Sequence, residues 1–171
     1  GVNPCAEEPL PAGGSCLLGS INLSAFVKDG KFDFADLKRV VKNAVIALND
    51  VLDEGLELHP LEEQRKSVSD WRQIGLGIFG LADMLIKLGI EYGSADAIYL
   101  CDTLGFTIAN VAIRTSARLA KKKGAYTNFK PEALKQNLFF IENTTGLTKQ
   151  LVKKHGWRNS QLLTIAPTGS I

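Results

Sequence analysis

The sequence predicts a mostly helical α/β fold that forms a single domain over residues 1–171. Three observations support this prediction. Short extended apolar segments lie near both ends of the chain, at residues 16–27 and 162–166. Capped stretches with a 3.6-residue apolar period lie between them. The chain has 171 residues, of which 45% are hydrophobic, and that is enough for one buried core.

The extended segments lie at the two ends. Residues 3–10 are expected to be extended because Pro4 disfavours helical geometry at Asn3. Residues 16–27 are expected to form a strand or buried coil, and the run Leu-Leu-Thr-Ile-Ala at residues 162–166 is typical of a buried strand. Two strands cannot close a sheet, so most of the sheet should lie outside this chain.

Helices fill the space between these segments. Each of the two longest begins at a residue whose side chain can cap it, Asp33 or Ser94, and ends at a glycine, Gly55 or Gly124. The expected helices run from Asp33 to Gly55, over residues 77–88, from Ser94 to Lys123, over a short turn from Pro131, and over residues 147–155.

Charge and composition exclude several function classes. The formal net charge is only +2, from 20 basic and 18 acidic residues. Proteins that hold a nucleic-acid backbone usually carry a larger, clustered basic excess, so no nucleic-acid polymer is expected as a partner. Glycine or charge interrupts the apolar runs before membrane-spanning length, and no signal peptide opens the chain, so no membrane partner is expected.

The cysteines and histidines suggest neither a disulfide framework nor a metal site. Cys5, Cys16 and Cys101 are widely spaced, unlike the pattern of a secreted disulfide-rich domain, so a cytoplasmic location is expected. His59 and His155 lack the ligand spacing of a zinc site, so no metal is expected. Cys101 lies on the long predicted helix and is expected to be buried in the core.

The sequence Asn3-Pro4-Cys5-Ala6-Glu7 is the first candidate site. Alternate residues of an extended segment face the same side, so an amide, a thiol and a carboxylate would line one face. A carboxylate can take a proton from a hydroxyl, an amide can orient a second hydroxyl, and a thiol can exchange a hydrogen atom. Fully extended, Asn3 and Glu7 would lie about 13 Å apart, so both reach one sugar only if the segment bends. A turn with an incidental cysteine is the alternative.

The second candidate site is Pro167-Thr168-Gly169-Ser170-Ile171, directly after the expected terminal strand. Backbone N–H groups in a turn of small and hydroxyl residues can approach an anion closely. The same residue types are also ordinary turn formers. The segment is therefore a candidate phosphate-binding loop.

Together, these motifs resemble the large catalytic subunit of the ribonucleotide reductase family. The stretch NPCAEEPLPAGGSCLLGSINLSAFV is similar to the family segment that places Asn-x-Cys-x-Glu on a finger loop inside a ten-stranded α/β barrel. The stretch RQIGLGIFGLADML, the long helix and the stretch HGWRNSQLLTIAPTGSI match the same family in the same order. The resemblance covers essentially the whole chain, and it implies a partial barrel domain truncated at both ends.

The resemblance implies that ribonucleotides are reduced to deoxyribonucleotides by thiyl-radical chemistry. Cys5 would become a thiyl radical that abstracts the ribose 3′ hydrogen, and Glu7 would act as general base on the 3′ hydroxyl. Asn3 would hydrogen-bond the sugar hydroxyls. Cys16 would be one of two cysteines that reduce the substrate and become a disulfide, with its partner outside this chain. Residues 167–171 would hold the substrate phosphates.

The family resemblance also implies a cofactor and partners. Glycyl-radical reductases lack the acid at Glu7, and NPCAEEPL followed by SCLLGSINL looks more like the adenosylcobalamin-dependent enzymes than the aerobic ones. Adenosylcobalamin is therefore expected in the full-length enzyme, with none bound to this part alone. The expected partners are a ribonucleoside diphosphate or triphosphate, the rest of the reductase chain, and a thioredoxin- or glutaredoxin-type reductant. This part alone is expected to be inactive and to self-associate.

Two alternatives from other classes stay open. Gly75-x-Gly77-x-x-Gly80 spells a dinucleotide-binding fingerprint, which needs a strand directly before it and an acidic residue about twenty positions later. Residues 67–73 do not have the pattern of such a strand, and Asp96 falls in a predicted helix. The other alternative is a non-catalytic helical assembly or regulatory piece in which the thiols are incidental.

Overall fold

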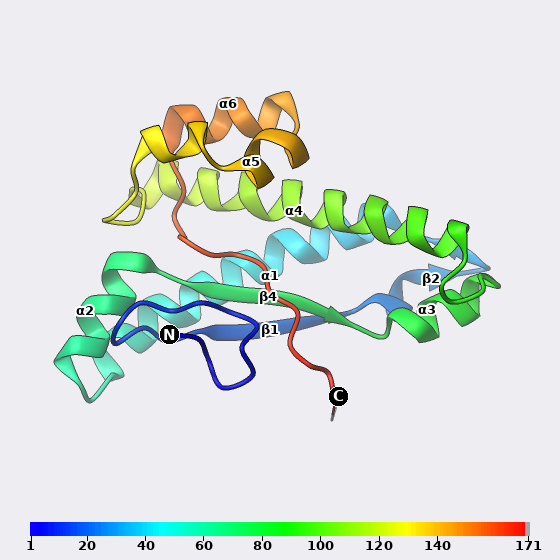
Figure 1. The fold of residues 1–171 in the computed structure, drawn as a ribbon, viewed down its shortest axis with the longest axis horizontal. Helices are drawn as coiled ribbons and strands as arrows, with labels where there is room; N and C mark the ends of the chain where they lie inside the picture. The colour runs from blue at the N-terminus through cyan, green and yellow to red at the C-terminus, as the bar shows by residue number, and fades with distance from the viewer. Residues whose placement is uncertain (170–171) are drawn as a thin grey trace.

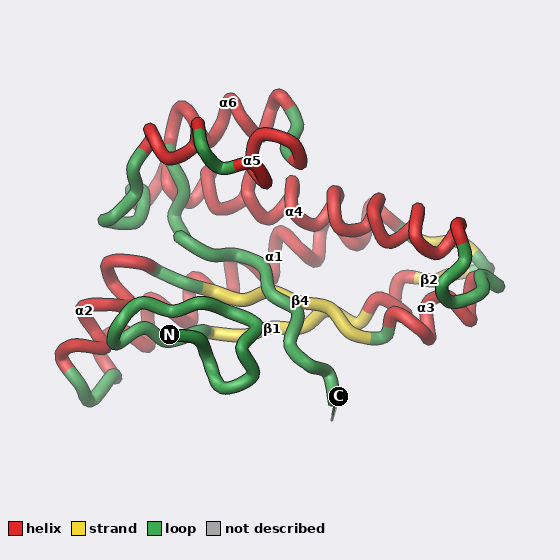
Figure 2. The backbone as a smooth tube through the Cα atoms, in the orientation of Figure 1, coloured by secondary structure: helices red, strands yellow, loops and turns green. Residues whose placement is uncertain are grey.

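The computed structural model describes residues 1–169, in which a small parallel sheet is covered by helices (Figure 1). Strands β1 (Leu17–Asn22) and β4 (Ile74–Phe79) pair in parallel, with Leu17 opposite Ile74. Strands β2 (Val27–Lys28) and β3 (Lys31–Phe32) form a short antiparallel hairpin. Figure 2 shows how small the strand content is beside the helices.

Helices build outward from the sheet in layers. Helix α1 contacts both β1 and β4, α4 packs on α1, and α6 packs on α4. The predicted caps are confirmed: the Asp33 side chain accepts from the Asp36 N–H, and the Ser94 side chain accepts from the Ala97 N–H. The helices are α1 (Phe34–Gly55), α2 (Glu62–Trp71), α3 (Leu81–Leu88), α4 (Ala95–Lys123), α5 (Leu138–Asn143) and α6 (Gly146–His155). The 3-10 turns are η1 (Leu23–Phe26), η2 (Leu56–Leu58) and η3 (Pro131–Lys135), so the short helix expected from Pro131 is a 3-10 turn.

Helix α4 is long and apolar enough to cross a membrane when judged by length and composition alone. A buried core helix passes the same test. Because α4 lies against α1 and also against α5 and α6, the apolar side chains on those faces pack within the domain. Leu104, Ile108 and Ala112 are among those buried there.

The prediction of one buried helix over residues 77–88 is wrong in its first part. Residues 74–79 form strand β4, and α3 begins only at Leu81. Residues 74–77 are all buried, so the large apolar side chains of Ile74 and Leu76 alternate with glycines that are buried as well. Of residues 16–27, which were expected to be strand or buried coil, residues 17–22 form β1, and the strand ends there because the Asn22 side chain accepts from the Ser24 N–H and starts η1.

The segment at residues 161–164 lies along the free side of β4. Leu163 forms a parallel bridge with Leu76, whose N–H donates to the Leu162 carbonyl at 2.9 Å. The Thr164 N–H donates back to the Leu76 carbonyl at 3.2 Å. The predicted terminal strand is thus extended and parallel, although only this one bridge is formed. Within residues 1–169 the other edge of β1 is unpaired.

A buried polar cluster fixes the entry to this segment. The side-chain amides of Asn159 and Asn49 donate to each other's oxygens, at 3.0 and 3.1 Å. Asn159 also donates to the Arg72 carbonyl at 2.9 Å and accepts from the Ser116 hydroxyl. Both asparagines are almost fully buried, so these bonds replace water for every one of their polar atoms. The cluster ties α1, α4 and the start of β4 to the chain just before residues 161–164.

Candidate functional site

The N-terminal ten residues fold into a closed loop, so the prediction of an extended segment at residues 3–10 is wrong. The Asn3 N–H donates to the Glu8 carbonyl at 3.1 Å, and the Asn3 side-chain oxygen accepts from the Glu8 N–H at 3.0 Å. Ala6 adopts a left-handed conformation with φ 62°. The loop bends because the Asn3 amide bonds locally to the backbone, a competitor of extended structure. Asn3, Cys5 and Glu7 therefore do not line one face of a strand.

Side chains from the sheet hold this N-terminal loop in place. The Gln73 and Gln161 amides both donate to the Pro9 carbonyl, at 3.1 and 2.9 Å. The Thr164 hydroxyl donates to the Glu7 carbonyl at 2.8 Å. Residues at the start of β4 and in the 161–164 segment thus bring the loop against the sheet, next to the start of β1. Figure 1 shows the loop, in dark blue, beside the red terminal segment.

Cys5 and Glu7 are placed differently on the loop. The Cys5 thiol is free and exposed. The two carboxylate oxygens of Glu7 are buried and have no hydrogen-bond partner among the described residues. Buried carboxylate oxygens without a partner are rare in folded proteins, and such a group calls for a functional explanation. A hydroxyl or another polar group brought to this loop would satisfy them.

Cys16 lies just before β1 and contacts Glu8. The Cys16 thiol donates to the Glu8 carboxylate, and Glu8 itself is only 2% exposed. Burial raises the pKa of the Cys16 thiol, and the hydrogen bond to Glu8 and the charges of Glu8 and Glu7 raise it further. Burial likewise raises the pKa of Glu8, although the Cys16 hydrogen bond opposes that shift. Cys16 is therefore held as a thiol.

The glycines of β4 make room for this arrangement. A Cβ on Gly75 would lie 2.5 Å from Thr164 Cγ2, 2.6 Å from Leu18 Cδ2 and 3.0 Å from Cys16 Sγ. A Cβ on Gly77 would lie 2.3 Å from the Thr164 carbonyl oxygen. Glycine in a strand interior typically marks such a close approach of another backbone. The side chains of Thr164, Leu18 and Cys16 therefore all approach Gly75 closely.

This placement argues against the dinucleotide-binding alternative. In that fingerprint the first glycines follow a strand and form the turn into a helix. Here Gly75 and Gly77 lie within β4, the preceding element is helix α2, and Asp96 is in the first turn of α4. The third glycine, Gly80, has φ 70° and precedes α3. Gly75 and Gly77 are therefore explained by the close approach of Thr164 to β4, and Gly80 by its left-handed conformation before α3.

The candidate phosphate-binding residues are described only in part. Pro167 and Gly169 are exposed, and Thr168 adopts a left-handed conformation with φ 56°. Ser170 and Ile171 lie outside the described residues. Among residues 1–169 no group of three histidine, cysteine, aspartate or glutamate side chains could hold a metal ion.

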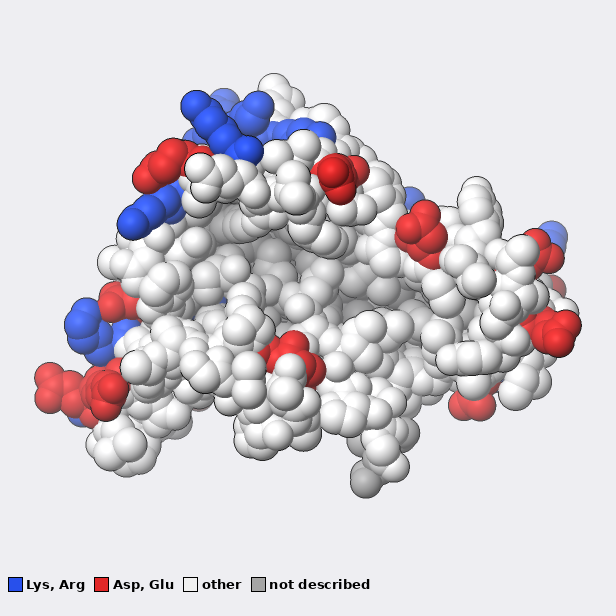
Figure 3. Space-filling view, viewed as in Figure 1, with Lys and Arg blue, Asp and Glu red and all other residues white. Residues whose placement is uncertain are grey.

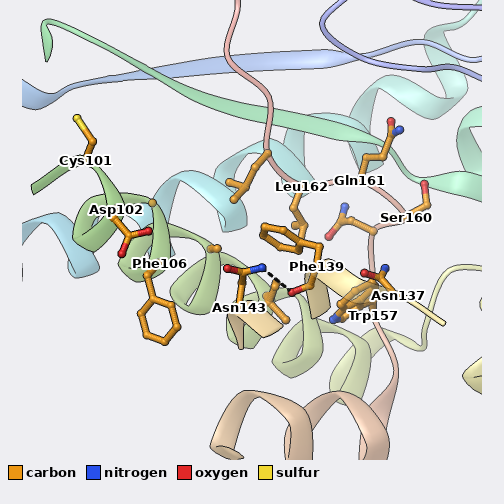
Figure 4. Close-up of a pocket in the computed structure, with 15 residues that line it drawn as sticks. Cys101, Asp102, Phe106, Asn137, Phe139, Asn143, Trp157, Ser160, Gln161 and Leu162 are labelled. Carbon is orange, nitrogen blue, oxygen red and sulfur yellow. Dashed lines mark hydrogen bonds between the residues drawn. The ribbon is translucent and has the colours of Figure 1, made fainter. Parts of the chain in front are cut away.

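A hollow in the surface lies apart from the candidate site, because Cys5, Glu7, Glu8 and Cys16 are not among its lining residues. Figure 3 shows it on the front face between the helices above and the sheet below, with few charged atoms inside it. It has a volume of about 650 Å³, and Phe106, Phe139, Trp157 and Leu162 are among its lining residues (Figure 4). Cys101 lies at its rim and is exposed, so the prediction that Cys101 is a core residue is wrong. The described elements leave that side of α4 uncovered.

The fold and the site define an α/β domain in which a short loop carries a free thiol and a buried carboxylate, and contacts a second thiol through Glu8, beside a parallel sheet. The family model for the ribonucleotide reductase barrel domain matches residues 1–171, and the chain belongs to that family. No closed barrel is formed by the described residues, which contribute β1, β4 and the 161–164 segment.

Individual relatives agree with the family assignment. The chain is 36% identical over 170 residues to a vitamin B12-dependent ribonucleoside-diphosphate reductase of Mycobacterium tuberculosis, covering 99% of this chain and 22% of that protein. It is 37% identical over 176 residues to the protein of the same name from Thermoplasma acidophilum, covering 99% and 20%. It is 32% identical over 177 residues to a ribonucleoside-diphosphate reductase subunit alpha of Chlamydia muridarum, covering 91% and 17%. The chain spans about a fifth of the length of the curated relatives it matches.

Two residues of the site, Glu8 and Thr164, were not singled out in the sequence, although Glu8 contacts Cys16 and Thr164 contacts Glu7. Gly75 was singled out only as part of the dinucleotide-binding fingerprint, and not as a neighbour of Cys16. The adjacent carboxylates Glu7 and Glu8 were a visible signal, because two neighbouring acids in a Pro-rich loop are not explained by solubility alone. Thr164 gave no such signal, since a threonine in a β-rich run is ordinary.

Proposed function

We propose that the full-length protein containing this chain reduces ribonucleotides to deoxyribonucleotides, with Cys5 as the radical-bearing thiol. The observation that carries the proposal is the N-terminal loop itself. It exposes the Cys5 thiol, buries the Glu7 carboxylate without a partner, and contacts the Cys16 thiol through Glu8. A radical acceptor, a base and a reductant are the three groups that this reaction needs, and one loop supplies or contacts all three.

Each residue has a separate task in the proposed reaction. The Cys5 thiyl takes the 3′ hydrogen atom of the ribose and later returns one, so it is regenerated. The Glu7 carboxylate takes the proton of the 3′ hydroxyl as the 2′ hydroxyl leaves as water. Cys16 and a partner cysteine outside this chain supply two electrons and become a disulfide. Ribonucleotide and dithiol thus become deoxyribonucleotide, disulfide and water.

Asn3 and residues 167–171 complete the proposed substrate site. The Asn3 oxygen already accepts from the Glu8 N–H, so the amide would meet the sugar hydroxyls through Nδ2. Residues Pro167, Thr168, Gly169, Ser170 and Ile171 would form the phosphate-binding loop, in which every residue except Pro167 has a backbone N–H to donate. The substrate is a ribonucleoside diphosphate or triphosphate, and the printed names of the relatives favour the diphosphate.

The radical generator would reach Cys5 from outside this chain, and the exposure of its Sγ fits that approach. Two relatives are named as vitamin B12-dependent, which supports adenosylcobalamin as the cofactor of the full-length enzyme. When bound, it supplies the radical that removes the hydrogen atom of the Cys5 thiol. A thioredoxin- or glutaredoxin-type reductant would then reopen the disulfide, and the enzyme would act in the cytoplasm.

The rest of the proposed ten-stranded barrel would come from outside this chain. The unpaired edge of β1 and the exposed side chains of Leu18 and Ile165 are suited to further strands and helices of the same polypeptide. The N-terminal loop would then be the finger loop inside that barrel.

The test is substitution of Cys5 in the full-length enzyme, with Cys101 as the matched control. Both thiols are free and exposed, but only Cys5 lies on the N-terminal loop. Cys5→Ser should abolish deoxyribonucleotide formation while nucleotide binding is retained, because a hydroxyl exchanges hydrogen atoms far less readily than a thiol. Cys101→Ser should retain turnover. Appreciable turnover by Cys5→Ser would refute the proposal.

A further inference from the structure

Glu8 is a buried acid that the proposed reaction does not use. It is 2% exposed, and its Oε1 atom is buried without a hydrogen-bond partner among the described residues. Its Oε2 atom accepts from the Cys16 thiol. Burying a carboxyl group costs free energy unless a specific interaction compensates. The compensating interaction found here is a thiol rather than a cation or a backbone N–H.

The loop backbone directs Glu8 toward Cys16. Its N–H and its carbonyl are both bonded to Asn3, so the Glu8 backbone cannot rotate without breaking two hydrogen bonds. Gly75 of β4 lies next to Cys16 and has no Cβ. A Cβ there would lie 3.0 Å from Cys16 Sγ, so the glycine leaves the space that this sulfur occupies. The contact is therefore fixed from both sides, by the loop and by β4.

We propose that Glu8 is a positioning residue for Cys16, holding its Sγ in place as a protonated thiol until the partner cysteine reacts. This proposal rests on the proposed function, since it gives the contact a role in the reducing step. In the disulfide form Cys16 has no S–H to donate, so the contact with Glu8 belongs to the reduced state only. Glu8 acts through Cys16 and does not itself touch the substrate.

The charges around Cys16 agree with this role. The charged groups that act on it are Glu8 and Glu7, both from the N-terminal loop. Gly75 of β4, which lies next to the Cys16 sulfur, is uncharged. Burial is the first cause of the raised pKa of Cys16, and the hydrogen bond to Glu8 and the two acids, with no cation acting on Cys16 among the described residues, disfavour its thiolate further.

The experiment is a thiolate titration of the full-length enzyme, kept reduced by a phosphine. Ultraviolet absorbance is recorded between about pH 7 and about pH 10, a range that spans the ordinary thiol pKa. The signal of Cys16 is the difference between each protein and its Cys16→Ala twin. Absorbance detects the thiolate without a thiol-modifying reagent. A variant whose loop is merely loosened, so that a reagent would reach Cys16 faster, therefore does not give a false shift in the titration.

Cys16 should stay protonated across this range in the parent, and in Glu8→Gln its thiolate should form at lower pH than in the parent, because the charge of Glu8 is lost while burial remains. Glu8→Gln keeps the size of the side chain and a hydrogen-bond acceptor but removes the charge. Below the midpoint of the titration, lowering the pKa of Cys16 by one unit increases its thiolate fraction tenfold. Glu57→Gln, which removes an exposed and distant charge, should titrate like the parent. Glu8→Met serves as the second variant where Glu8→Gln fails to fold, as judged by circular dichroism.

Identical Cys16 titrations in the parent and in the folded Glu8 variant would overturn the proposal. This outcome is distinguishable from failure of the proposed function. Turnover by Cys5→Ser would reject the radical role of Cys5 and leave the Glu8 titration shift standing. If the Cys16 titration is the same in the parent and the Glu8 variant while Cys5→Ser is inactive, only the role of Glu8 is rejected.

Discussion

The Thr164 hydroxyl donates a hydrogen bond of 2.8 Å to the Glu7 carbonyl, across 157 positions of the chain. This bond fastens the N-terminal loop to the segment that lies along β4. It also orients the residue proposed as the general base, because the backbone of Glu7 cannot turn away while the bond is held. The loop and the terminal segment thus act as one unit.

Thr164→Val should destabilise the protein by about 1–2 kcal/mol, because it removes the hydroxyl, keeps the shape and leaves the Glu7 carbonyl without its donor. It should also lower turnover more than it raises KM. The matched control is Thr103→Val, whose hydroxyl bonds only to the Tyr99 carbonyl of its own helix. Urea unfolding and steady-state kinetics check both variants. Equal stability and activity of Thr164→Val and the parent would show that this bond does not hold the loop.

Gly75→Ala should cost about 1–3 kcal/mol, the usual range for overpacking. The added Cβ would lie 2.5 Å from Thr164 Cγ2 and 3.0 Å from Cys16 Sγ, so either the terminal segment or Cys16 must move. Gly105→Ala is the control, because nothing lies within 4 Å of its added Cβ and alanine favours the helix, by about 0.5–1 kcal/mol. Thermal unfolding should therefore move in opposite directions for the two variants. A Gly75→Ala protein as stable as Gly105→Ala would contradict the close approach described here.

The two longest helices could be predicted from the sequence, but strand β4 and the geometry of the site could not. The ends of α4 are encoded nearby, by the Ser94 cap and Gly124, and both were predicted. Strand β4 was missed because its glycines weaken the pattern of apolar side chains set by Ile74 and Leu76. These glycines are needed because Thr164, which is remote in sequence, approaches them closely. The thiol and acid residues of the N-terminal loop could be recognised in the sequence. The bend of that loop could not, because it depends on the hydrogen bond from the Glu8 N–H to the Asn3 side-chain oxygen.

Glu7→Gln and Cys16→Ser should fail at different steps of the proposed reaction. Loss of a general base typically slows turnover about a hundred- to ten-thousand-fold, so Glu7→Gln should slow an early proton transfer. Cys16→Ser should instead stop reduction after the radical step, and products of substrate breakdown should then accumulate. Glu142→Gln, an exposed acid on α5, is the control for the change in charge. Product analysis after a single turnover separates the two, and normal deoxyribonucleotide yield from both variants would remove both roles.

The 171-residue chain alone should be inactive and should self-associate. Its β1 edge is unpaired within the described residues, and Leu18, Phe106 and Ile165 are exposed. Such edges and apolar side chains pair with other copies when their own neighbours are missing. Light scattering should show species larger than a monomer, and titration with a ribonucleoside diphosphate should give a Kd no tighter than about 1 mM, roughly −4 kcal/mol. A monomer that binds the nucleotide at micromolar concentration would contradict this expectation.

The central claim is that the radical resides on the Cys5 sulfur, and electron paramagnetic resonance tests it most directly. The full-length enzyme is mixed with its radical generator and substrate, frozen within the first turnover, and compared with protein that carries β-deuterated cysteine. Deuteration should change the hyperfine pattern of the radical signal, because the unpaired electron couples to the β hydrogens of the cysteine that bears it. The signal should persist in Cys16→Ser and Cys101→Ser and be absent in Cys5→Ser. A cysteine-coupled radical that survives in Cys5→Ser would place the radical elsewhere and contradict the account.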